Sequence, residues 1–107
     1  MVDTLTGKGY VATTTDAAGL TAGANETITL VGVTVANIHA SAGCKITVNV
    51  VRSGGVDSEL AHLIEIPVND SLDILQGKIV LNANDAIWFD AEINSHLEVA
   101  LSYLVQT

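Results

Sequence analysis

Residues 59–89 contain short apolar runs separated by clusters of turn-forming residues, ELAHLIEIPVNDSLDILQGKIVLNANDAIWF. The clusters are Val68-Asn69-Asp70, Gln76-Gly77 and Asn82-Ala83-Asn84-Asp85. Short β-rich runs between Asn, Asp and Gly clusters are typical of antiparallel strands joined by tight turns. This stretch therefore predicts strands over residues 60–66, 78–81 and 86–91, and a short strand or a single helical turn over residues 71–75.

Alternating apolar residues predict further strands, each with one buried face. Residues 44–51, CKITVNVV, and residues 97–105, LEVALSYLV, show this period of two. Residues 26–39 form a longer strand in which the apolar residues change parity at Leu30-Val31-Gly32, and a glycine there predicts a β-bulge. The regular C-terminal strand is expected in the middle of its sheet.

These strands predict an all-β fold, an antiparallel β-sandwich that is jelly-roll-like and has about seven or eight strands. A chain of 107 residues has room for one domain. Aromatic residues make up only 4% of it, so the core has to be aliphatic. The expected core consists of Ile46, Val48, Ile66, Ile79, Ile87, Phe89, Val99 and Leu101.

The first 24 residues differ in composition from the rest, since they are rich in Thr, Gly, Ala and Asp and poor in large apolar residues. We therefore divide the chain into an N-terminal segment, 1–24, and a β-sandwich domain, 25–107. One interpretation of the segment is an edge strand at Tyr10-Val11-Ala12 followed by a loop over residues 16–25. The other is an arm that contacts a neighbouring subunit, with Tyr10 and Val11 as contact residues.

The charge balance excludes several partners. Twelve acidic residues against four basic ones give a net charge of −8. Nucleic acids and anionic membrane surfaces bind clustered cationic side chains, so neither is an expected partner. Cys44 is the only cysteine, which excludes an internal disulfide and is typical of synthesis in a reducing compartment. The first ten residues have no signal-peptide pattern, and the longest apolar run, 30–36, is too short to span a bilayer.

The histidines and carboxylates do not have the spacing of a metal site. His39, His62 and His96 lie on separate predicted strands or turns. Asp90 and Glu92 share one face of a strand, which is more typical of a solvated strand face than of a cation site. The turn at 82–85 is rich in Asn and Asp, but it lacks the glycine and the distal glutamate of a calcium loop.

Nucleophilic catalysis has no better support. Cys44 has inward parity in its strand, where cysteine behaves as a small hydrophobe. No serine lies in a glycine-flanked elbow, and there is no phosphate-binding glycine loop. The chain is therefore predicted not to be an enzyme, with no catalytic residue, no metal ligand and no cofactor.

Trp88 has the opposite parity to Ile87 and Phe89 in its predicted strand. It is either an outward-facing aromatic that binds a partner or a side chain packed on the second face of the strand, and burial is the favoured interpretation. Trp88 joins Tyr10 and Val11 as a candidate partner-contact residue.

Four segments after residue 25 follow one another in a recognisable order. They are VTVANIHAS (Val33 to Ser41), KITVNVVRSGG (Lys45 to Gly55), IPVNDSLDILQGKIVLNANDAIWF (Ile66 to Phe89) and LEVALSYLVQT (Leu97 to Thr107). This order of strands and turns, with its proline-containing strand and closing SYL strand, resembles small virion structural proteins of tailed bacteriophages. Residues 1–24 carry no part of the resemblance.

The resemblance implies a β-sandwich that is made in the host cytoplasm and becomes part of the virion. A capsid decoration (cement) protein fits best, one that binds the major capsid protein and stabilises the assembled head. It would be a homo-oligomer, expected to be a trimer. A neck, tail or fibre-associated protein is the alternative, and a carbohydrate-binding module is the alternative from another class. Apolar residues of both parities at 30–35 and 50–51 are expected to give apolar surface for assembly.

Overall fold

The computed structural model describes residues 3–14, 17–39, 41–75, 77–93 and 96–107. These residues form nine β-strands and no helix. The strands are β1 (Asp3–Val11), β2 (Ala17–Thr21), β3 (Thr27–Asn37), β4 (Cys44–Val51), β5 (Ser58–Ile66), β6 (Ser71–Asp73), β7 (Ile79–Leu81), β8 (Ala86–Ala91) and β9 (Leu97–Gln106).

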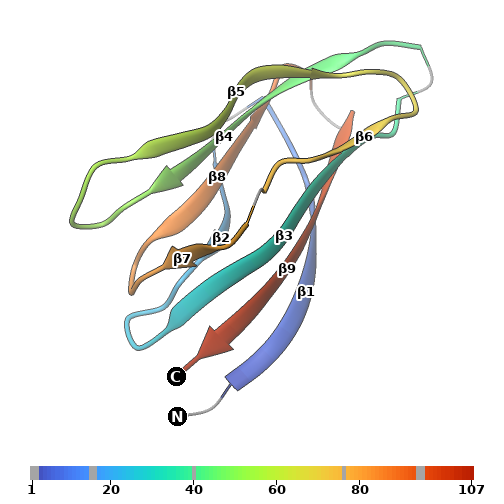
Figure 1. Cartoon of the computed structure of the whole chain (residues 1–107). Coiled ribbons are helices and arrows are strands. Elements are labelled where there is room, and N and C mark those ends of the chain that lie inside the picture. The colour runs from blue at the N-terminus through green and yellow to red at the C-terminus, as the bar shows by residue number, and fades with distance from the viewer. Residues whose placement is uncertain (1–2, 15–16, 40, 76, 94–95) are drawn as a thin grey trace.

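The strands form two antiparallel sheets that face each other (Figure 1). Sheet A has the order β1-β9-β3-β6, and β7 pairs with another part of β3; sheet B has the order β2-β8-β4-β5. Because β6 and β7 lie along the same edge of β3, each sheet has four strand positions, and the chain crosses between the sheets in the order of a jelly roll. The predicted jelly-roll sandwich is confirmed, and β9 lies between β1 and β3 as expected.

The core between the sheets is largely aliphatic, with two aromatic side chains, Phe89 and Tyr103. Tyr10 packs on Phe89 with ring centroids 5.6 Å apart, which ties β1 to the core. Of the expected core residues only Ile79 is partly exposed, at the margin of the cluster. The others are fully buried: Ile46, Val48, Ile66, Ile87, Phe89, Val99 and Leu101.

Strand β3 contains the predicted bulge. Its register against β9 shifts between Leu30 and Gly32, so Val31 is an extra residue in the ladder. The bulge lets Leu30 before it and Val33 after it both point into the core. The prediction that residues 30–35 give a second, outward apolar face is therefore wrong for Leu30, Val33 and Val35, which are buried. It holds for Val31, which is 42% exposed.

The N-terminal segment is paired into both sheets. Strand β1 pairs with β9 along its whole length, from Asp3–Gln106 to Val11–Glu98. The loop expected over residues 16–25 instead contains strand β2, which pairs with β8. Gly19 makes this pairing possible, because a Cβ there would lie 2.5 Å from Cε2 of Phe89.

The predicted turns lie where the strands end. Pro67 follows the last residue of β5, and Asp70 N donates to Pro67 O at 3.1 Å to close the next turn. Asn69 and Asn84 adopt positive φ angles of 60° and 68°, a conformation that asparagine tolerates better than most residues. Gln76, Asn94 and Ser95 of the other predicted turns lie outside the described residues.

Candidate functional site

The outward side of sheet A, here called outer face A, is nearly free of charge. Strand registers and alternating burial assign its residues row by row across the sheet, and the first row is Leu5, Leu104, Thr29 and Val80. From that row to the row of Val11, the charged residues are two acids, Glu98 and Asp73; in the row beyond Leu5, Asp3 pairs with Gln106 and Gln106 with Thr27. The other members of the rows from Leu5 to Val11 are small or apolar: Gly7, Ser102, Val31, Gly32, Gly9, Ala100, Thr34, Val11, Ala36 and Ser71.

The outward side of sheet B, here called outer face B, is polar and acidic. Lys45 pairs with Glu65, and Glu92 N donates to Lys45 O at 2.9 Å beside them. Asp90 lies opposite Thr47 on the same face. The two outer faces of the sandwich therefore differ in character, and outer face A is the one a partner can cover at low desolvation cost.

The three predicted contact residues do not form one surface. Val11 is 45% exposed at the end of β1 on outer face A, whereas Tyr10 points inward against Phe89. Trp88 lies on outer face B, half-buried, in a row with Ala18, Asn49 and Glu59.

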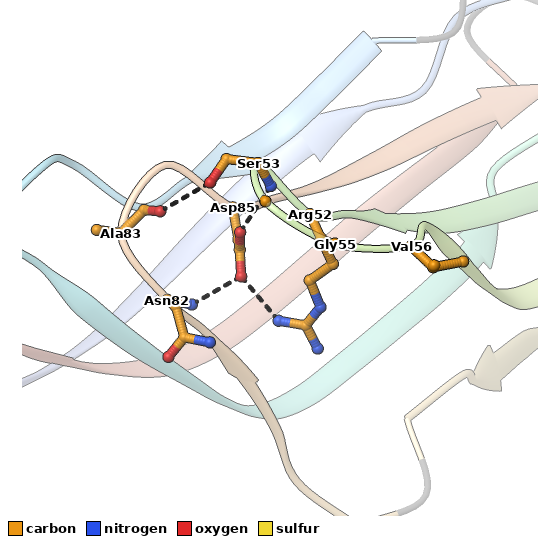
Figure 2. Close-up of a pocket in the computed structure, with 8 residues that line it drawn as sticks. Arg52, Ser53, Gly55, Val56, Asn82, Ala83 and Asp85 are labelled. Carbon is orange, nitrogen blue, oxygen red and sulfur yellow. Dashed lines mark hydrogen bonds and ion pairs between the residues drawn. The ribbon is translucent and has the colours of Figure 1, made fainter.

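A cavity of about 490 Å³ lies between the β4–β5 and β7–β8 connections (Figure 2). Asp85 forms part of its wall and is only 3% exposed. The Oδ1 atom of Asp85 accepts from Ser53 N at 2.9 Å, and Oδ2 accepts from Arg52 Nη1 at 2.9 Å and from Asn82 N at 3.0 Å. Arg52 Nη1 also donates to Val80 O at 2.6 Å. The cavity is lined by Arg52, Ser53, Gly54, Gly55, Val56, Asn82, Ala83 and Asp85.

These hydrogen bonds keep the pKa of Asp85 below its ordinary value. The backbone N–H of Ser53 has the largest effect and outweighs the opposing effect of burial; Arg52 and the Asn82 N–H lower the pKa further. Both carboxylate oxygens accept hydrogen bonds within the protein, three in all, so the arrangement gives Asp85 a structural role. Asp85 thus joins the β4–β5 and β7–β8 connections, which are far apart in sequence. Asp85 and its three donors, Arg52, Ser53 and Asn82, are here called the Asp85 latch.

The fold also brings together two histidines that sequence spacing did not connect. The rings of His39 and His96 stack with centroids 3.8 Å apart and an angle of 15° between planes. Nδ1 of His96 is buried and has no hydrogen-bond partner. His62 lies elsewhere, with Nδ1 2.7 Å from Glu59 Oε2. Across the described ranges, no three His, Cys, Asp or Glu side chains are grouped to hold a metal ion.

Cys44, the chain's single cysteine, is fully buried at the start of β4. Its thiol therefore cannot meet the thiol of another chain without local opening of the sandwich. In the part of the chain that the structure describes, no helix is long and apolar enough to cross a membrane.

Comparison with known proteins shows that the fold of this chain is similar to that of a solved structure. No protein-family model matches the chain, and no curated protein matches it. Among the solved structures that match, one aligns with a TM-score of 0.57 and 10% sequence identity over 97% of this chain and 84% of that one. It is described as Bacillus endospore appendages that form a novel family of disulfide-linked pili. At this identity the match supports the β-rich architecture and says nothing of shared residues.

Sequence reasoning missed the latch, the histidine stack and the contrast between the two outer faces. The sequence shows Asp85 at the end of the 82–85 turn. It does not show that two of the donors to Asp85, Arg52 and Ser53, come from the β4–β5 connection. The contrast between outer faces depends on which strands share a sheet, which the residue pattern alone does not reveal.

Proposed function

We propose that this protein is a non-enzymatic structural subunit that binds an assembled particle through outer face A. The observation that carries the proposal is the near absence of charge on that face in a chain with a net charge of −8. Covering a face of mostly small and apolar residues costs little desolvation, whereas outer face B would bring Lys45, Glu65 and Asp90 into the contact.

The specific form we propose is a decoration (cement) protein on the head of a tailed bacteriophage. The support is the sequence resemblance from Glu26 to the C-terminus, together with the jelly-roll architecture. In this role the protein binds the assembled shell and not isolated capsid subunits. Binding then stabilises the shell by mass action, by about 2.7 kcal/mol per site at a free concentration about one hundred times the Kd.

The experiment is to separate virions that carry the protein into heads and tails and to identify it in each fraction by mass spectrometry. A decoration protein is found with heads, and adding the purified protein to undecorated heads raises their melting temperature. Recovery only with tails would reject decoration and support the neck, tail or fibre alternative. Unchanged melting of saturated heads would reject the stabilising role.

The carbohydrate-binding alternative rests on one observation. Trp88 is a partly exposed aromatic on a polar face, next to Asn49 and in the same row as Glu59 one strand further on. An aromatic ring with hydrogen-bonding groups near it is the combination on which sugars stack. If it binds sugars, a glycan array detects binding that Trp88→Ala abolishes. Absence of any glycan signal with the native chain removes this alternative.

A further inference from the structure

Most edge strands of the two sheets are protected against pairing with another chain. Strand β2 has a register shift between Ala18 and Leu20. Strand β5 has two shifts and a left-handed residue, Leu63, with φ of 48°. Strands β6 and β7 are three residues each. Bulges and short length are the usual means by which sheet edges avoid pairing.

Strand β1 has none of these protections. All nine of its residues pair with β9 without a register shift, and it contains no proline. Lys8, the charge near its centre, is directed away from the edge, because Nζ donates to Gly19 O of β2 at 2.6 Å. A long edge strand with an unbroken register is a template for a further strand.

The hydrogen-bonding groups on the free side of β1 can be identified. Ala12 N donates to Leu97 O at 3.0 Å, so the even-numbered residues next to it exchange hydrogen bonds with β9. The alternation of an antiparallel ladder then points the N–H and C=O of Leu5, Gly7 and Gly9 away from β9. The sole strand partner of β1 among the described residues is β9.

We propose that β1 pairs with β1 of a second copy of this chain, antiparallel, about a two-fold axis at Gly7. Gly7 then exchanges two N–H···O bonds with Gly7 of the second copy, and all nine residues of each strand are paired. Outer face A continues across the axis into a face twice as wide. This inference names a partner within the proposed structural role and rests on that role.

Side-chain fit selects this register over its neighbours. Leu5, 74% exposed, lies opposite Gly9 of the second copy, and there is nothing within 4 Å of the Cβ position at Gly9. Lys8 lies opposite Thr6. Moving the register by two residues in one direction sets Lys8 against Lys8, and moving it in either direction leaves residues at the strand ends unpaired.

The first test is sedimentation of the native chain and of two proline variants. Gly7→Pro removes an N–H at the proposed axis without breaking the ladder to β9. Thr21→Pro is the matched control, because Ala22 N donates to Asp85 O and the N–H of Thr21 therefore points away from β8 at another edge. We expect a native dimer whose Kd rises about tenfold or more in Gly7→Pro and stays unchanged in Thr21→Pro. A native monomer, or equal weakening by both variants, overturns the proposal.

The second test keeps the proposal falsifiable if a proline variant fails to fold. Paired Cα atoms about 5.5 Å apart across the axis are within disulfide reach. Gly7→Cys should therefore form a cross-linked dimer under mild oxidation, and Gly54→Cys in an exposed loop should not. If Gly7→Cys cross-links no faster than Gly54→Cys, the proposed register is rejected. A trimer that persists in Gly7→Pro rejects β1 pairing but leaves head binding, tested separately on particles, intact.

Discussion

Asp85 is a buried carboxylate whose hydrogen bonds contribute to the stability of the fold. Replacing it with Ala leaves the Arg52 guanidinium and the N–H groups of Ser53 and Asn82 without their shared acceptor. We expect Asp85→Ala to lower the free energy of unfolding by about 3 kcal/mol, measured by urea denaturation. Asp90→Ala on outer face B is the control, with a change of about 0.5 kcal/mol or less. Equal effects of the two substitutions would contradict the latch.

The same residue predicts a dependence of stability on pH. The pKa of Asp85 in the folded chain is below the ordinary value of 3.8, so its contribution is fully present above that value and is lost as pH falls through the folded pKa. The melting-temperature difference between the native chain and Asp85→Asn should therefore shrink below about pH 4. A difference that stays constant down to the acid transition would show that ionisation of Asp85 contributes no stability.

Gly19 is predicted to tolerate no side chain. The added Cβ of Gly19→Ala would overlap the Phe89 ring, so β2 must move away from β8 or the ring must leave its rotamer. We expect a loss of about 1–3 kcal/mol in unfolding free energy. Gly54→Ala, at a position with open space around it, should change stability by about 0.5 kcal/mol or less. Tolerance of alanine at position 19 would mean that β2 packs less closely than described.

At the scale of elements, sequence alone predicts the strands that bury one face between clear turns. The bounds of β4 and β8, Cys44–Val51 and Ala86–Ala91, agree with the predicted ones because alternation and flanking turns both mark them. Strand β2, AAGLT, has neither a strong β-former pattern nor a second turn signal. It is a strand because β8 supplies its hydrogen bonds and Phe89 its packing, and both are distant in sequence.

The bulge in β3 gives a prediction for deletions. Without Val31, Leu30 and Val33 fall on one parity, and the ladder to β9 becomes regular with the same core. The deletion of Val31 should therefore fold, with circular dichroism and a cooperative melt close to those of the native chain. Deletion of Thr34 is the contrasting variant, because it turns Val35 out of the core. If the two deletions melt alike, the bulge does not set the register.

At the scale of the whole molecule, the sequence predicted the jelly roll but neither the latch nor the difference between the outer faces. Period-two patterns show that each strand has a buried side and an exposed side. They do not show which exposed sides lie together, since that depends on crossovers between sheets. Tyr10, Val11 and Trp88 illustrate this limit: each was a reasonable contact residue, yet the fold separates them onto the core, outer face A and outer face B.

Arginine substitutions on the two outer faces test the central claim most directly. Ala100→Arg places a cation in the middle of outer face A, and Asn49→Arg places one on outer face B. Co-sedimentation with assembled particles would be measured for both variants, once circular dichroism shows that each is folded. The account predicts that Ala100→Arg no longer co-sediments and that Asn49→Arg binds like the native chain. Binding that survives Ala100→Arg and is lost in Asn49→Arg would contradict it.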